Sequence, residues 1–304
     1  MPEIILHQYK ASPFSEKIRR ILAFKKMPWR SVEAAMMNPK PMLTPLTGGY
    51  RRIPVMQIGA DIYCDSSLIA RSLERLQPEP TIFPDGREGE ITLFSLWADR
   101  HLFFSAVPVA MIAAADFLPA EFKADREAMS SQMNFEKLRK ALPGARDQLR
   151  GFYDLFARQL EGRPFLMGES FSLADAAVYT TVWFLRSIPE AKALIESQPR
   201  LGEWFERCKG FGRGEKTGME EGEALAIARE AAPATAAQAD PQDPNGLRPG
   251  DAVAIIPDDY AFDPVKGEIV SLSIHEVAIR RDDPQVGEVV VHFPRIGFRI
   301  SRDA

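Results

Sequence analysis

The spacing of apolar residues changes twice along this chain of 304 residues, and no other feature of the sequence constrains the fold as strongly. Over the first 80 residues, short strand patterns alternate with helical ones. From residue 88 to residue 230 every clear pattern is helical, and beyond residue 250 only short strand patterns remain. The sequence therefore predicts an α/β part, an all-α part and a small all-β part in series.

The α/β part, residues 1–80, predicts a βαβ unit followed by a ββα unit. The Pro- and Gly-rich stretch 38–49 between them predicts a loop. Because βαβ crossovers are right-handed, the first two strands should pair in parallel, and the hairpin after them adds antiparallel strands. The expected strands are residues 4–9, 29–35, 53–58 and 62–64, and the expected helices start at Ser12 and Asp65.

The helix that starts at Ser12 has two distinct sides. Apolar residues recur at helical spacing, at Ile18, Ile21 and Leu22, and basic residues fill the remaining positions. Because charged side chains are rarely buried, we expect these basic residues to face solvent. They are Lys17, Arg19, Arg20, Lys25 and Lys26.

The all-α part, residues 86–230, predicts a bundle of roughly four to six helices followed by one more surface-like helix. The periodic segments are residues 88–115, 135–160, 172–188 and 199–211, and the last helix is expected over 215–230. Residues 231–245 hold Ala, Pro, Gln and Asp with hardly any large apolar side chain, and this composition predicts a linker.

Five short strand patterns lie between residue 246 and the end at 304, with Pro-Gly-Asp and Asp-Asp-Pro turns near them. Several short strands within about 55 residues are typical of a small closed sheet. The sequence therefore predicts an SH3-like barrel. The strands are expected at residues 251–256, 267–274, 276–281, 288–293 and 297–300.

Composition excludes several classes of protein. A net charge of −4 and a pI near 5.7 give no electrostatic reason to expect nucleic acid or an anionic membrane as partner. The apolar run 106–115 is too short to cross a bilayer, and the first residues lack the features of a secretory signal. Cys64 and Cys208 form no CxxC pair and no metal-ligand spacing. We expect a protein of the cytoplasm without a metal.

The first candidate motif runs from Tyr9 to Ser15, where a strand leads into a helix N-terminus. Such an end presents unpaired N–H groups and a positive dipole, which favour an anion such as a thiolate. Serines at 12 and 15 stand where a redox motif would carry cysteines, so disulfide exchange through this turn is excluded. Capping of the helix by Ser12 is the structural alternative.

Two further motifs follow in the α/β part. Ile53 precedes Pro54 at the start of a strand, where its backbone could pair with an extended peptide. Asp65 and Ser66 open the next helix, which offers N–H groups to a carboxylate and an acid to an ammonium group. A free α-amino-acid terminus needs both. The structural alternatives are a strand edge marked by proline and a helix capped by Asp65.

Taken in this order, at these separations and before an all-helical segment, the three motifs resemble the cytosolic glutathione transferase family. The resemblance covers residues 1–212 and implies a thioredoxin-like glutathione-binding domain joined to an all-helical domain. Residues beyond 213 have no counterpart in two-domain members. We therefore expect a multidomain chain with domains at 1–80, 86–230 and 246–304 and a linker at 231–245.

The resemblance implies roles for the residues of the first motif and one loop. Ser12 lies at the position of the thiol-activating residue, with Ser15 and then Tyr9 as further candidates, since the family varies in this position. Lys40 lies in the loop where the family often places a group near the glycine carboxylate of glutathione. A solvated loop lysine is the alternative for Lys40.

The other two motifs also acquire roles by this resemblance. Ile53, with Pro54, corresponds to the backbone segment that holds the cysteinyl moiety. Asp65 and Ser66 correspond to the pair that holds the γ-glutamyl group. In the helical half, residues 171–175 resemble the family's capping segment, in which Ser172 and Asp175 form a capping box of structural importance only.

The family implies an enzyme of the glutathione S-transferase class. Glutathione would serve as co-substrate, its thiol activated for attack on a small apolar electrophile, with no metal and with a homodimer as the working form. Trp97, Phe103 and Phe104 could line the electrophile site, although aromatic residues at helical spacing usually form core. The alternative is a non-catalytic binding or assembly protein on the same scaffold, whose C-terminal β domain engages a partner.

Overall fold

The structure is a computed structural model that describes residues 2–303. The chain forms two compact units, which we describe separately. The first, the sheet unit, consists of Met1–Ser15, Pro28–Ser72 and Glu215–Ala304, and the second, the helical unit, consists of Glu16–Met27 and Leu73–Gly214. The C-terminal residues therefore belong to the same unit as the N-terminal ones.

The predicted βαβ–ββα arrangement is present. All of its strands belong to the sheet unit, whereas its first helix belongs to the helical unit from Glu16 on and its second helix from Leu73 on. Strands β1 and β2 pair in parallel, β1 pairs with β3 in antiparallel fashion, and β3 and β4 form the hairpin. The loop expected over residues 38–49 holds one short helix. The bounds are β1 Ile5–Gln8, α1 Pro13–Phe24, β2 Trp29–Glu33, α2 Thr44–Thr47, β3 Val55–Ile58, β4 Asp61–Cys64 and α3 Ser66–Leu76.

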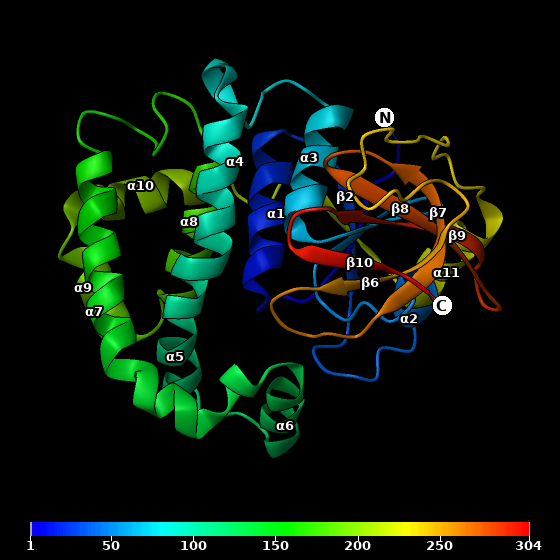
Figure 1. The fold of residues 1–304 in the computed structure, drawn as a ribbon. Helices are drawn as coiled ribbons and strands as arrows, with labels where there is room; N and C mark the ends of the chain where they lie inside the picture. Colours follow the sequence, from blue (N-terminus) through cyan, green and yellow to red (C-terminus); the bar gives the residue numbers. More distant parts are fainter. Residues whose placement is uncertain (1, 304) are drawn as a thin grey trace. The chain divides into compact units, whose positions relative to one another are not determined.

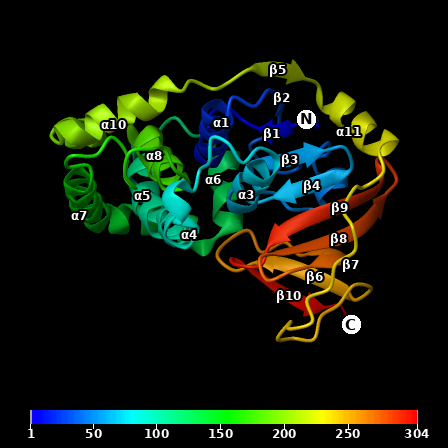
Figure 2. The same cartoon turned by 90° about the horizontal axis from the view of Figure 1, so that it is seen from above.

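The C-terminal strands continue this sheet. Strands β6 to β9 form an antiparallel meander, β10 returns to pair with β6, and β9 pairs in parallel with β4. One sheet of ten strands results, in the order β10-β6-β7-β8-β9-β4-β3-β1-β2-β5 (Figure 2). The strands are β6 Ala252–Pro257, β7 Val265–Leu272, β8 Glu276–Asp283, β9 Gly287–Pro294 and β10 Phe298–Arg302.

The five predicted strands are therefore present, but the predicted separate barrel is wrong. Strand β9 pairs with β8 on one side and with β4 on the other, so the added strands extend the main sheet. An alternating apolar pattern identifies a strand and its buried face, whereas its pairing partner depends on which sheet edge is open. The open edge here was that of β4.

One buried apolar cluster joins the added strands to the N-terminal strands and to the loop around α2. It contains Val55 and Ile62 from the first hairpin and Val291 from β9. The ring of Tyr50 lies 5.8 Å from that of Phe293, centroid to centroid. Because the two parts share one core, the C-terminal strands are part of the scaffold.

A cluster around His292 adds polar contacts at the β4–β9 junction, and we call it the His292 cluster. His292 Nε2 lies 3.0 Å from Asp61 Oδ1, and its Nδ1 lies 2.7 Å from Glu276 Oε1. Thr235 Oγ1 donates to Asp61 Oδ1 at 2.5 Å, and the Tyr63 ring stacks on the imidazole at 4.3 Å. Four segments of the chain thus meet at one buried imidazole.

The other edge of the N-terminal sheet is covered as well. Strand β5 (Lys216–Met219) pairs in parallel with β2, and α11 (Glu221–Glu230) follows it. The single helix expected over 215–230 is therefore wrong in its first part. A strand of four residues, three of them exposed, has too little alternation to be recognised from sequence.

Residues 231–245 contain no helix or strand, but they are bonded to the sheet. The Ala234 N–H donates to Asp61 Oδ2 at 2.7 Å, and Gln238 forms an isolated bridge with Ser271. The domain boundaries expected from the sequence stay a prediction.

The helical unit confirms the expected helical segments and adds two helices, α6 and α9. A π-helical turn (Ala98–Leu102) separates α4 from α5, and all residues of α8 except Phe184 are buried. Figure 1 shows α7, α8 and α10 in green to yellow. The helices are α4 Glu88–Trp97, α5 Phe103–Ala113, α6 Ala120–Met129, α7 Phe135–Gln159, α8 Leu173–Leu185, α9 Pro189–Glu196 and α10 Pro199–Gly210.

The predicted capping box at the start of α8 is confirmed. Ser172 Oγ accepts the Asp175 N–H, and the Asp175 carboxylate accepts the Ser172 N–H at 3.0 Å. The same carboxylate also accepts the indole N–H of Trp204 at 2.8 Å. The role of Asp175 is therefore structural. Within residues 2–303, no helix combines the length and apolar character that spanning a bilayer requires.

Candidate functional site

The three motifs lie at one end of three neighbouring strands of the sheet unit. The register pairs His7 of β1 with Val55 of β3, and Val55 with Cys64 of β4. The residues that follow β1, precede β3 and follow β4 therefore meet at the same end of the sheet. They are residues 9–15, 53–54 and 65–66.

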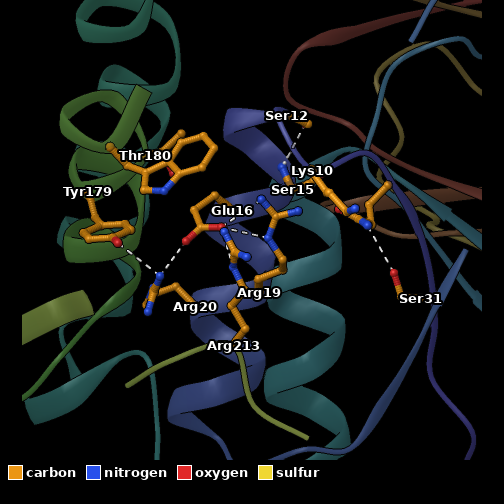
Figure 3. Close-up of polar contacts among 12 residues, drawn as sticks. Lys10, Ser12, Ser15, Glu16, Arg19, Arg20, Ser31, Tyr179, Thr180 and Arg213 are labelled. Atoms are coloured by element: carbon orange, nitrogen blue, oxygen red, sulfur yellow. Dashed lines mark hydrogen bonds and ion pairs between the residues drawn. The ribbon is translucent and has the colours of Figure 1, made fainter. Parts of the chain in front are cut away.

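Ser12 caps the first turn of α1. Its Oγ accepts the backbone N–H of Ser15 at 3.1 Å (Figure 3), and its own N–H donates to the Tyr9 carbonyl oxygen at 3.0 Å. The structural alternative considered above is thus present. The cap occupies a lone pair of the hydroxyl oxygen, and among the described residues no group accepts the hydroxyl proton. Capping leaves Ser12 able to donate.

Ser15 lies three residues further along the chain and is fully buried. Its hydroxyl has no hydrogen-bond partner among the described residues. A buried hydroxyl without a partner costs about 1–3 kcal/mol, so its presence calls for an explanation. Ser12 and Ser15 both remain candidates for hydrogen bonding to a thiolate.

Ile53 has an unpaired backbone. Within residues 2–303, no group hydrogen-bonds to its N–H or its carbonyl oxygen, and its side chain is partly buried against the apolar core. The bond between Ile53 and Pro54 is cis, and Pro54 is buried. An unpaired donor and acceptor on one residue next to a strand can pair with an extended peptide.

Asp65 caps α3 with only one of its carboxylate oxygens. Oδ1 accepts the Ser67 N–H at 2.8 Å and the Ser67 hydroxyl at 2.7 Å, whereas no described residue donates to Oδ2. The backbone of Asp65 lies in the left-handed region, with φ at 78°, which is uncommon for a residue with a side chain. Ser66 is buried, with 7% exposed. The second oxygen of Asp65 is available to a cation.

Lys40 is buried rather than solvated, with 6% of its surface exposed. Its ammonium group donates to the carbonyl oxygen of Ala35. Lys40 also lines a pocket of about 860 Å³ in the sheet unit, together with Tyr50 and Arg51 on one side and Asp263 on the other. Residues of the C-terminal extension therefore help to form a cavity next to a predicted site residue.

Arg52 is a neighbour of the site that sequence reasoning missed. Its guanidinium pairs with Asp259 at 2.5 Å and stacks on the Tyr260 ring, 3.7 Å from the ring centroid. In the sequence, only the position of Arg52 directly before Ile53 could have indicated that it lies beside the site. Residues 258–264, between β6 and β7, carry no periodic pattern that would relate them to residue 52.

The basic residues of α1 correct an expectation, because four of the five are buried. In the helical unit, Glu16 accepts hydrogen bonds from Arg19 at 2.8 Å and from Arg20 at 2.5 Å (Figure 3). Lys17 pairs with Asp99, and Lys25 with Glu74, each at 2.5 Å. Buried charges persist when they are paired, and the acids that pair with Lys17 and Lys25 are distant in sequence.

The aromatic residues of the first long helices pack among themselves in the helical unit. The Trp97 ring meets that of Phe152 edge-on at 5.2 Å, and Phe103 stacks on Phe184 at 5.8 Å and contacts Phe104 at 5.9 Å. These contacts are those of a core. Any role of Trp97, Phe103 and Phe104 toward an electrophile stays a prediction.

The two cysteines are not candidates for a nucleophile. Both are buried, and burial raises the pKa of the Cys64 and Cys208 thiols well above the usual value, so both stay protonated. His7 is buried too. Burial lowers its pKa to about 4 despite a hydrogen bond to Gln57, so it is neutral. Among residues 2–303, no cluster of three potential ligands suits a metal ion.

The fold and these motifs define a class of protein, a thioredoxin-like sheet combined with an all-helical unit. Comparison with family profiles is consistent with this class. Residues 6–81 match the family described as "Glutathione S-transferase, N-terminal domain", and residues 136–207 match "Glutathione S-transferase, C-terminal domain".

A relative with the same extension is known. A GST-like protein from Pseudomonas syringae is 38% identical in sequence, and the match covers 100% of both chains with a TM-score of 0.82. The chain belongs to the glutathione S-transferase family. It is also similar to Glutathione S-transferase U4 of Arabidopsis thaliana, at 24% identity over 208 residues, or 68% of this chain and 84% of that protein.

More distant structures share the fold over about two thirds of this chain. A glutathione S-transferase from Methylobacillus flagellatus, solved with glutathione bound, is 20% identical with a TM-score of 0.51 over 67% of this chain and 94% of that chain. A beta-etherase from Sphingobium is 16% identical with a TM-score of 0.56 over 68% and 94%.

Proposed function

We propose that this protein binds glutathione in its sheet unit and activates the thiol for attack on a small apolar electrophile. The observation that carries the proposal is the convergence of three unsatisfied groups at one end of β1, β3 and β4. They are the Ser12 hydroxyl proton, the backbone of Ile53 and Oδ2 of Asp65. A γ-glutamyl-cysteinyl peptide offers a matching partner to each of them.

The three groups would hold three parts of the tripeptide. Asp65 Oδ2 would accept the α-ammonium group of the γ-glutamyl residue, while Ser66 and the N-terminus of α3 would face its carboxylate. The N–H and carbonyl groups of Ile53 would pair with the backbone of the cysteinyl residue, as a strand is added to a sheet edge. Lys40 would lie toward the glycine carboxylate.

The reaction would begin with a thiolate. The thiol gives its proton to water, and the thiolate accepts a hydrogen bond from the Ser12 hydroxyl next to the positive end of α1. The sulfur then attacks a carbon of the electrophile, a sulfur–carbon bond forms, and the leaving group departs with its electron pair. A homodimer and a cytoplasmic location belong to the proposal through family membership.

The pKa of bound glutathione tests the thiol-activating role of Ser12. Replacing Ser12 with Ala removes the donor, so we expect the thiol pKa to rise by about one unit, equal to the net free energy of one hydrogen bond. The measurement is thiolate absorbance as a function of pH for the enzyme–glutathione complex, with the conjugation rate of an aryl halide beside it. An unchanged pKa would remove Ser12 from its role.

Ser15→Ala is the matched control, since both serines lie in the same turn of α1. If Ser15 is the activating residue, the shift appears in Ser15→Ala and is absent in Ser12→Ala. Aryl halide turnover that both variants retain in full would contradict activation by this turn altogether.

A further inference from the structure

The loop between β6 and β7, residues 258–264, is bonded to the segment that precedes the first hairpin. Arg52 pairs with Asp259 at 2.5 Å, donates to the carbonyl oxygen of Tyr260 and stacks on the Tyr260 ring. Both partners of the ion pair are largely buried, with 10% of the Arg52 side chain and 19% of the Asp259 side chain exposed. Ion pairing and cation–π stacking on one guanidinium hold the loop firmly.

Further hydrogen bonds and the backbone conformation of Ala261 also fix this loop. The Asp258 N–H donates to the Gly297 carbonyl oxygen at 3.0 Å, and the Tyr260 N–H donates to Asp259 Oδ1 at 2.9 Å. Ala261 is 4% exposed and has φ at 51°, in the left-handed region. Residues other than glycine keep such a backbone only where the surroundings fix it.

The two ends of the fixed loop lie near two parts of the candidate glutathione site. The Tyr260 ring stacks on Arg52, which directly precedes Ile53. At its other end, Asp263 and Pro264 line the pocket that Lys40 also lines. One loop of the extension thus borders the groups assigned to the cysteinyl and glycyl parts.

The side chain of Tyr260 is suited to an anionic peptide. Burial raises the pKa of its phenol, and the charge of Asp65 adds to this, so the hydroxyl keeps its proton at neutral pH. A protonated phenol donates a hydrogen bond, and its ring offers an apolar surface to the peptide. The nearby Tyr50 phenol stays protonated for the same reason.

We propose that the β6–β7 loop is a second wall of the glutathione site and that Tyr260 is a binding residue in direct contact with the tripeptide. The inference rests on the proposed function. It gives the C-terminal strands a role in binding, because they carry a site residue that two-domain relatives lack.

The dissociation constant of reduced glutathione, measured by calorimetry on the full chain, tests this inference. Tyr260→Phe keeps the ring on Arg52 and removes the hydroxyl, so we expect binding to weaken about 3- to 10-fold. Tyr260→Ala also removes the ring and should weaken it further. Ile274→Ala is the control, since this residue is 74% exposed, lies outside the β6–β7 loop and should leave binding as in the unaltered protein.

The outcomes separate the inference from the proposed function. Binding that weakens in Tyr260→Ala but not in Tyr260→Phe supports contact through the ring alone. Dissociation constants in both variants equal to that of Ile274→Ala would overturn the inference and leave the proposed function intact. An unaltered protein that binds no glutathione at millimolar concentration would overturn both.

Discussion

Two serine hydroxyls in the first turn of α1 differ in how they are held. Ser12 accepts a backbone N–H, and a hydroxyl that accepts is polarised toward donating its own proton. Ser15 is buried without a partner among the described residues. The helix cap and thiol activation are therefore compatible roles for Ser12, although the sequence presents them as alternatives.

The Ser12→Thr variant retains a hydroxyl that can both cap the helix and donate to the thiolate. The pKa of the bound glutathione thiol should therefore equal that in the unaltered protein.

The two carboxylate oxygens of Asp65 also have different roles. Its Oδ1 holds Ser67 and caps α3, while Oδ2 is left to a ligand. The sequence could identify Asp65 because acid-then-serine at a helix start is a local pattern. Tyr260 could not be identified in this way, since its relation to Arg52 exists only in three dimensions.

At the scale of elements, the His292 cluster joins β4, β8 and β9 and the chain before them. Burial disfavours the imidazolium, but the hydrogen bonds and charges of Asp61 and Glu276 outweigh it and raise the pKa of His292 above 6.5. Burial would raise the pKa of Asp61, yet its bonds to His292, Thr235 and Ala234 lower it below 3.8. Both groups are thus stabilised in their charged forms.

The directions of these pKa shifts determine how the free energy of unfolding depends on pH. The His292 contribution to the free energy of unfolding is complete below pH 6.5 and is lost as pH rises through the raised pKa of the folded state. The Asp61 contribution is present above pH 3.8 and is lost as pH falls through the lowered pKa. His7 acts in the opposite direction to His292, because burial keeps its imidazole neutral. Its destabilising contribution to the free energy of unfolding grows as pH falls from 6.5 to about 4.

We therefore expect His292→Gln to lower the free energy of unfolding by roughly 3 kcal/mol at pH 6, because it leaves the buried Asp61 and the partly buried Glu276 without their cation. The difference from the unaltered protein should shrink as pH rises to 9, and His7 cancels in this difference. Urea denaturation at several pH values measures it. A difference that stays constant from pH 6 to pH 9 would contradict a charged His292.

Most elements could be predicted from periodicity, and the exceptions have physical reasons. Helices α7 and α10 follow apolar patterns because each buries one face, and α8 and the hairpin β3–β4 are apolar runs that are buried almost entirely. Strand β5 was missed since only Met219 of its four residues is buried. The burial of Lys17 and Lys25 was missed since their acidic partners come from other elements. Pairing partners are long-range information that a local pattern does not contain.

At the scale of the whole molecule, the extension is part of the scaffold. Val291 and Phe293 of β9 share a core with Val55 and Ile62 of the first hairpin, and β9 pairs with β4. The sequence predicted the number of added strands correctly. It did not predict that they join the main sheet, because the edge of β4 is a property of the assembled sheet.

A nick in the connecting segment tests this integration. If a protease recognition sequence is inserted between Asp240 and Pro241, cleavage should leave both fragments together, because they are held by the sheet and the shared core. Size-exclusion chromatography of the nicked protein without denaturant is the measurement, and the same run in urea is the control. Fragments that separate without denaturant would contradict a common scaffold.

The central claim is that the end of β1, β3 and β4 binds glutathione, and calorimetric titration of the full chain with reduced glutathione tests it most directly. We predict saturable binding that weakens about 10- to 100-fold in Asp65→Ala/Ser66→Ala, because charge-assisted hydrogen bonds to the γ-glutamyl group are lost. Asp116→Ala, which changes an exposed acid of the helical unit, should bind normally. No binding at millimolar glutathione, or equal binding in the double variant, would contradict the claim.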